Sequence, residues 1–213
     1  ERVPERNLGS WPTAALPNDW CGEEGKGSYA FIPCDTAWVT RALYWVWKQM
    51  LTYRDGTLSV HLLFNRASPW ADIDSYIPYQ GRVDIKVKQP LDLCLRIPEW
   101  VSPRDVGVRV VDGNGDAHER NTAFNGRYVQ IGSVRQDDVV TVVFPIHERT
   151  DSVDIRMGGS QEQFSLVRRG NDVVSIFPRG RYYPFYQQRG HYRTGEPRWR
   201  KVERFVSNET VDQ

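Results

Sequence analysis

The spacing of apolar residues changes from helical to alternating near Gly56, and it is irregular at both ends of the chain. Residues 1 to about 33 show no period and are interrupted by prolines and glycines. From Thr36 to about Tyr53 the apolar residues follow a helical period, with Asp35 suited to cap the first turn. They cover well over half of the helix circumference. We therefore expect burial on more than one side, with this chain supplying only one of those sides.

After Gly56 a period of about two predicts a series of strands. Gly and Asp turn signals, such as Asp-Gly-Asn-Gly at 112–115, separate these strands at intervals of roughly 8–15 residues. We predict a mainly β fold, an antiparallel β-sandwich that could divide into two sub-sheets, with one N-terminal helix and an extended C-terminal segment. The predicted strands are 57–65, 72–77, 82–88, 91–97, 106–111, 128–131, 139–144, 153–157, 163–167 and 173–176.

The C-terminal segment, 179–204, is basic and rich in aromatic residues. It could bind single-stranded nucleic acid through phosphate contacts and stacking, or place aromatic faces against sugar rings. Its arginines could instead pair with carboxylates of an adjacent domain while the aromatic rings fill the seam. The balanced charge of the whole chain makes nucleic acid the least favoured of the three, and we expect the segment to pack against an adjacent domain.

Composition narrows the classes of partner. The 213 residues include 28 Lys and Arg against 27 Asp and Glu, so the formal charge is +1 and nucleic acid is disfavoured as a partner. No run of about 18 apolar residues occurs, so we expect no membrane partner. Three cysteines are an odd number, which disfavours a disulfide framework and leaves the localisation unknown.

The candidate chemistry is sparse. The sequence contains no phosphate loop, dinucleotide fingerprint, HExxH or GxSxG motif. His61 lies opposite the apolar face of its strand, and we expect it to be structural or solvent-facing; His118 and His147 fall in predicted turns. Cys34 precedes the predicted helix, where the helix dipole favours a thiolate, and it could share a metal with Asp35. The alternative is an ordinary buried thiol.

Several stretches resemble, in the same order, the β-L-arabinofuranosidases of glycoside hydrolase family 127. Residues 40–47 (Thr-Arg-Ala-Leu-Tyr-Trp-Val-Trp) are similar to the helix that follows the paired cysteines of that family, and residues 56–64 look like the strand after it. Residues 95–100 (Leu-Arg-Ile-Pro-Glu-Trp) resemble its Leu-Arg-Ile-Pro-x-Trp signature. Residues 126–129 and 137–145 fit a later pair of strands.

This resemblance covers roughly residues 34–206 and implies a catalytic (α/α) barrel followed by β-sandwich domains. Region 1–54 would then be an irregular lead plus the last, barrel-type helix, and region 55–213 the β-sandwich region with its extended tail. The resemblance puts Cys34 at the position of the catalytic nucleophile and implies zinc as a cofactor, with Cys34 and Asp35 as ligands. Asp35 stands where the family has a second cysteine. The other ligands and the acid/base glutamate would belong to the barrel outside this chain.

Two further functions remain open beside a glycoside hydrolase that works only when completed by a barrel domain or partner chain. A non-catalytic carbohydrate-binding or interaction module would need exposed Trp or Tyr faces. A nucleic-acid binder would need exposed arginines in the tail and would lose affinity steeply with salt.

Overall fold

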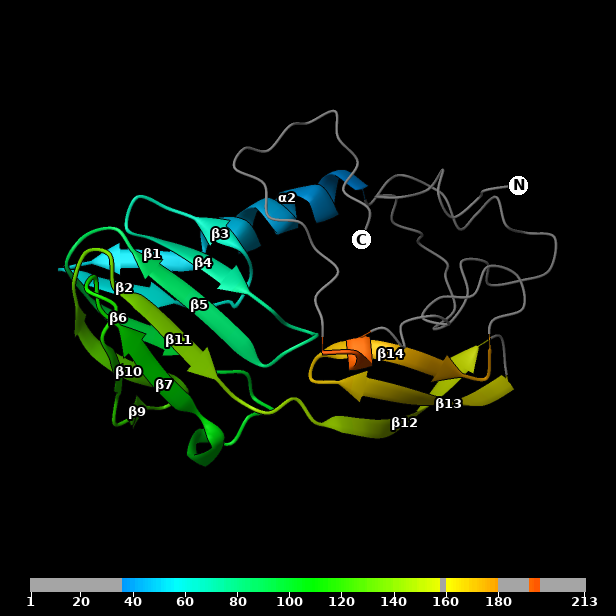
Figure 1. Ribbon diagram of the computed structural model, residues 1–213. Helices are drawn as coiled ribbons and strands as arrows, with labels where there is room; N and C mark the ends of the chain where they lie inside the picture. Colours follow the sequence, from blue (N-terminus) through cyan, green and yellow to red (C-terminus); the bar gives the residue numbers. More distant parts are fainter. Residues whose placement is uncertain (1–35, 158–159, 180–191, 196–213) are drawn as a thin grey trace.

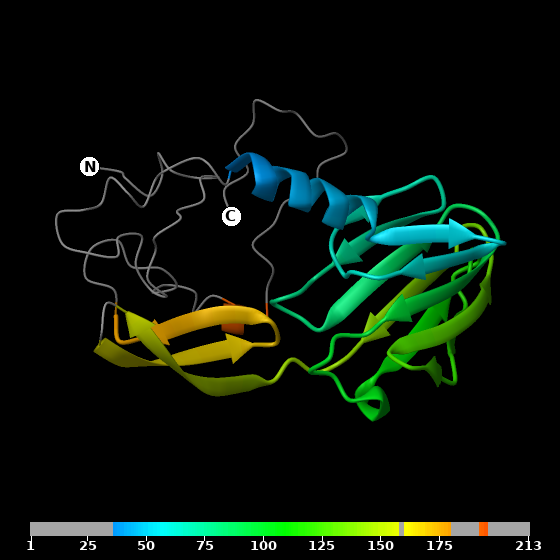
Figure 2. The same cartoon turned by 180° about the vertical axis from the view of Figure 1, so that it is seen from behind.

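The computed structural model describes residues 36–157, 160–179 and 192–195 (Figure 1). It contains one α-helix, two sheets stacked on each other and a third sheet beside them, seen from the opposite side in Figure 2. The coarse prediction of a mainly β chain with one N-terminal helix is confirmed for this part of the chain. Most of the C-terminal segment, 179–204, lies outside the described residues.

Helix α2 (Thr36–Lys48) is shorter than expected. The prediction that it continues to Tyr53 was wrong, because residues from Leu51 onward form a strand. The Asp55-Gly56 pair has positive φ angles of 48° and 79°, which suits a two-residue hairpin loop. The turn signal therefore closes a hairpin instead of ending the helix.

The first sheet has the order β1-β2-β6-β10-β9. Its strands are β1 (Leu51–Arg54), β2 (Thr57–Val60), β6 (Leu91–Arg96), β10 (Tyr128–Val134) and β9 (Ala123–Asn125). All neighbours are antiparallel except β2 and β6, which are parallel with Thr57 opposite Asp92. The expected purely antiparallel sandwich thus contains one parallel pair, because the chain crosses to the other sheet between these two strands.

The second sheet has the order β3-β4-β5-β11-β7-β8 and is antiparallel throughout. Its strands are β3 (Arg66–Ala67), β4 (Ala71–Ser75), β5 (Arg82–Val87), β11 (Val139–Val143), β7 (Gly107–Val111) and β8 (Ala117–Glu119). A short 3-10 helix, η3 (Pro103–Asp105), precedes β7. The strands β1, β3, β8 and β9 were not predicted, and His118 lies in β8 rather than in a turn.

The core lies between these two sheets. Alternate residues of the strands point inward, as the period of two requires, and many of them are fully buried. We call this pair of sheets the sandwich. Core residues with zero exposure include Leu58, Val60, Val83, Ile85, Val87, Leu95, Ile97, Val129, Val140 and Val142.

The third sheet contains β12 (Glu148–Met157), β13 (Ser160–Arg169) and β14 (Asp172–Phe177) in sequence order. It lies at one end of the sandwich (Figure 1). The side chain of Arg169 joins the two units, since it donates to the carbonyl oxygens of Pro78 at 3.2 Å and Tyr79 at 3.4 Å. Nearby, Arg193 pairs with Glu148 at 2.7 Å, and Tyr192 meets Tyr79 edge to face.

Among the described residues, no helix combines the length and the apolar character that crossing a lipid bilayer requires.

Candidate functional site

Helix α2 exposes most of its large apolar residues, and both views show it projecting from the edge of the sandwich (Figures 1 and 2). A typical water-facing helix would carry polar residues on the side away from the core. We define these residues as the α2 apolar surface. They are Trp38 (69% exposed), Leu43 (53%), Tyr44 (54%), Trp45 (46%), Val46 (44%) and Trp47 (52%).

Within the described residues, the contacts that hold α2 against the sandwich lie at the C-terminal end of the helix. Met50, two residues beyond the helix, is 3% exposed and belongs to the core. Arg66 of β3 lies over the ring of Trp47 at 4.2 Å and donates to the Trp47 carbonyl oxygen. The rings of Tyr44 and Trp47 are stacked on each other, with centroids 6.2 Å apart. This arrangement fixes the helix at its end, while its aromatic side chains stay about half exposed or more.

A cleft of about 220 Å³ lies between the sandwich and the β13–β14 hairpin. Four separate parts of the sequence meet there: the residues after β2, Ile77 after β4, the end of β6 with the residues that follow it, and the β13–β14 turn. We call it the His61 cleft. Its lining residues are His61, Leu62, Leu63, Phe64, Ile77, Arg96, Ile97, Pro98, Trp100, Asn171 and Asp172.

His61 is fixed in place by hydrogen bonds to both ring nitrogens. Its Nε2 lies 2.7 Å from the Thr52 hydroxyl, and its Nδ1 lies 2.6 Å from the Tyr128 hydroxyl. Burial and the nearby positive charge of Arg96 lower the pKa of His61 below its ordinary value near 6.5. A neutral imidazole with one donating and one accepting nitrogen suits two hydroxyl partners. The ring is therefore held in place by its neighbours, which agrees with a structural role for His61.

The Leu-Arg-Ile-Pro-Glu-Trp motif forms one wall of this cleft. Arg96 donates to the carboxylate of Glu99 at 2.5 Å. Arg127 donates to the carbonyl oxygens of Pro98 and Val101, the latter at 2.7 Å, and so fixes the path of the motif. These contacts of Arg96 and Arg127 thus stabilise the bend of the chain at the end of β6.

Trp100, the last residue of the motif, packs against the β13–β14 loop. A Cβ atom on Gly170 would lie 2.8 Å from the nearest carbon of the Trp100 ring. On its other side the same ring meets Phe144 edge to face, with centroids 5.7 Å apart. Gly170 also has a positive φ of 61°, which the first position of a type II′ hairpin loop requires. The motif therefore serves as the joint between the sandwich and the third sheet.

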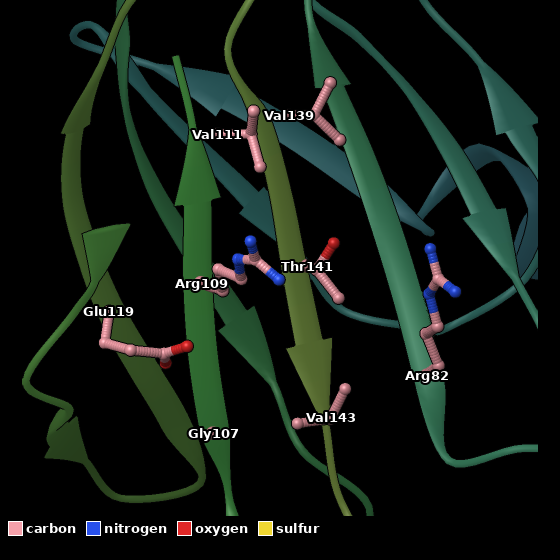
Figure 3. Close-up of a pocket in the computed structure, with 8 residues that line it drawn as sticks. All are labelled: Arg82, Gly107, Arg109, Val111, Glu119, Val139, Thr141 and Val143. Atoms are coloured by element: carbon pink, nitrogen blue, oxygen red, sulfur yellow. The ribbon is translucent and has the colours of Figure 1, made fainter. Parts of the chain in front are cut away.

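A second, wider hollow of about 630 Å³ lies on the outer face of the six-stranded sheet (Figure 3). None of its eight lining residues is aromatic. Arg82 forms a two-point ion pair with Asp84 at 2.5 and 2.9 Å, and Thr141 donates to the same carboxylate at 2.8 Å. Because these polar groups satisfy one another and no ring is offered for stacking, this hollow is a weaker candidate for a sugar than the His61 cleft.

Cys34 and Asp35, the proposed nucleophile and zinc ligands, lie outside the described residues, as does Cys21. In the part of the chain that the structure describes, no three His, Cys, Asp or Glu side chains come together as a metal group would require. Cys94 is 8% exposed, and its sulfur lies 3.2 Å from the hydroxyl of Ser59. It is a structural thiol of the first sheet.

The sequence did not reveal the His61 cleft, because its walls come from segments more than 100 residues apart. The Leu-Arg-Ile-Pro-Glu-Trp motif was the one signal present, and nothing local connects it with Asn171 and Asp172. Their arrival depends on the register of β13 and β14, which pairs Arg169 with Asp172.

No protein-family model and no curated protein matches this chain. Among solved structures it is similar to a GH127 beta-L-arabinofuranosidase from Geobacillus stearothermophilus T6, with a TM-score of 0.46, 18% identity, and coverage of 67% of this chain and 24% of that one. A structure described as a glycoside hydrolase gives 0.49, 18%, 70% and 26% in the same order. A GH127 beta-arabinofuranosidase gives 0.47, 21%, 67% and 26%. The chain spans about a quarter of the length of each of these proteins.

Proposed function

We propose that this chain is the C-terminal portion of a glycoside hydrolase that acts on arabinofuranoside-like carbohydrate. The catalytic barrel would be a domain or partner chain outside this sequence, and the sandwich would brace it and shape the substrate cleft. The α2 apolar surface is the observation that carries this proposal. We expect a helix with exposed Trp38, Trp45 and Trp47 to pack against a further domain or chain. The resemblance of residues 40–47 to a barrel-type helix supports a catalytic barrel as that domain.

The size of this surface supports a permanent partner rather than a chance contact. Aromatic side chains contribute large contact areas, and burying apolar area stabilises an association by about 25 cal/mol per Å². Single exposed apolar residues are normal on a protein surface, but six on one short helix are not.

In this proposal Cys34 is the nucleophile of a retaining reaction. Its thiolate would attack the anomeric carbon, forming a C–S bond as the glycosidic C–O bond breaks. A carboxylic acid of the barrel would protonate the leaving oxygen. The resulting carboxylate would then take a proton from water as the water attacks the same carbon, which breaks the C–S bond and releases Cys34 as a thiolate. A zinc ion held by Cys34, Asp35 and residues of the barrel would favour the thiolate over the thiol.

The test uses the complete protein, isolated with whatever barrel domain or chain accompanies it. Hydrolysis of 4-nitrophenyl β-L-arabinofuranoside and zinc content are measured for the wild type, Cys34→Ser and the control Cys94→Ser. We expect about one zinc per complex, loss of hydrolysis in Cys34→Ser, and near-normal hydrolysis in Cys94→Ser, since a hydroxyl can keep the contact with Ser59. Wild-type rates in Cys34→Ser would contradict the proposed role of this cysteine.

The alternative is a non-catalytic carbohydrate-binding or interaction module, and the exposed aromatic side chains of α2, above all Trp38 at 69% exposed, favour it. The two functions differ in the same assay. A module would bind arabinose-containing oligosaccharide, with a change in tryptophan fluorescence, but would cleave nothing in the complete protein.

A further inference from the structure

We propose that the His61 cleft binds one residue of a neutral carbohydrate. The inference deepens the proposed function, on which its choice of substrate class partly rests, by giving carbohydrate a second place on the chain, apart from Cys34.

The size of the cleft limits its ligand. Pockets for drug-sized molecules usually measure about 300–1,000 Å³. The His61 cleft, at about 220 Å³, falls below this range and therefore suits a single ring rather than an extended molecule. It is formed by two structural units joined through Trp100 and Gly170, so its walls are already in place before a ligand arrives.

The charges in the cleft balance and favour a neutral ligand. Arg96 brings a positive charge from β6, and Asp172 brings a negative charge from the start of β14. Outside the lining residues, Glu99 pairs with Arg96 at 2.5 Å and lies 3.7 Å from Arg127, so these four groups together also carry no net charge. An anion attracted by Arg96 would also meet the carboxylate of Asp172, and a cation would meet the guanidinium of Arg96. His61 adds no charge near neutral pH, because its environment holds it in the neutral form.

The cleft presents both donors and acceptors, as a polyol requires. Arg96 uses one Nη group on Glu99, and a guanidinium has five N–H donors in all. Asn171 also lines the cleft, and its amide can both donate and accept. Sugar hydroxyls can likewise act in both roles.

The apolar wall gives the C–H face of a sugar ring a surface to contact. Phe64 lines the cleft and is 59% exposed, while Leu62 and Leu63 beside it are half-buried. An exposed ring next to fixed polar groups is an unusual arrangement for a purely structural residue, and it is the arrangement in which an aromatic side chain packs against a sugar.

The experiment measures binding to the full chain by ligand-observed NMR with saturation transfer. The probes are L-arabinose and methyl β-L-arabinofuranoside, with D-glucuronate as an anionic comparison. Phe64→Ala and Arg96→Gln remove the apolar wall and the main donor. Phe177→Ala and Arg109→Gln are matched controls, since both residues are exposed and neither lines the cleft.

We expect a neutral sugar to bind, and each cleft variant to weaken that binding by about tenfold while the controls leave it unchanged. Absence of binding by the neutral sugars, equal binding in Phe64→Ala and Arg96→Gln, or tighter binding of D-glucuronate would overturn the inference. Cys34→Ser separates this site from the proposed function. Cys34→Ser should stop hydrolysis and leave sugar binding at the cleft intact. If the wild type hydrolyses the substrate but no sugar binds at the cleft, the cleft inference fails and the proposed function stands.

Discussion

Strand β6 and helix α2 are both rich in apolar residues, but they meet opposite environments. Leu91, Leu93 and Leu95 of β6 are between 0% and 6% exposed. The six residues of the α2 apolar surface are between 44% and 69% exposed. The sandwich therefore completes its own core, whereas the helix has an apolar surface that the described part of the chain does not cover.

The largest expected effect is on the covered side of this comparison. Leu95→Ala removes a side chain with zero exposure from the centre of the first sheet. We expect the free energy of unfolding to fall by about 2–5 kcal/mol, because truncation loses both apolar burial and packing. Urea denaturation followed by circular dichroism measures this, and a loss below about 1 kcal/mol would show that the core is looser than its burial indicates.

A smaller effect is expected at the joint between the sandwich and the third sheet. Gly170→Ala places a methyl group 2.8 Å from the Trp100 ring and also strains a backbone with φ of 61°. Gly126→Ala is the matched control, because its φ is 59° but no atom lies within 4 Å of the added carbon. Both variants lose about 1 kcal/mol to backbone strain, and overpacking costs Gly170→Ala a further 1–3 kcal/mol or so.

Thermal unfolding of these two variants isolates the contact with Trp100. Equal midpoints for Gly170→Ala and Gly126→Ala would mean that the third sheet moves away from the sandwich without cost.

The next effect concerns pH. The pKa of His61 is lower in the folded chain than its ordinary value, so the unfolded chain binds more protons between the two values. The stability from neutral His61 is therefore present above about pH 6.5 and is lost as the pH falls below it. Urea denaturation at pH 7.5 and 5.5 should show a smaller loss in His61→Gln than in the wild type. His118→Gln, a change at an exposed histidine, should lose as much stability between the two pH values as the wild type does.

The smallest effect is expected on the uncovered side. Trp38→Ser and Leu43→Ser should each change the free energy of unfolding of this chain alone by less than about 0.5 kcal/mol, because both side chains are more than half exposed. In the complete protein the same changes should destabilise the assembly, which size-exclusion chromatography detects. A large loss of stability in the chain alone would show that α2 is already covered, and it would remove the contrast with β6.

The sequence predicted the strands whose burial alternates and missed several short strands whose burial does not. Strands β5 and β6 place every second residue in the core, so their pattern was visible. Strand β8 is exposed at all three positions, and β9 is nearly so; short edge strands of this kind carry no period. The helix was extended too far because Leu51 continues a helical spacing, although its backbone pairs with Val60 across a hairpin.

The candidate site was less accessible still. Cys34 and Asp35 stay predictions, because they lie outside the described residues. The His61 cleft depends on contacts between segments that only the tertiary structure brings together. The motif at 95–100 could be noticed in the sequence, but its role as a joint depends on Gly170, which no local pattern connects with it.

The short link between α2 and β1 has a mechanical consequence. Only Gln49 and Met50 separate the helix from the strand. Met50 is buried in the core, and Arg66 packs over the ring of Trp47. The helix therefore projects from the sandwich and cannot rotate freely about its C-terminal end. A partner that packs on it would be held at one angle to the sandwich, so a torque applied to either body would pass to the other through the β1–β2 hairpin.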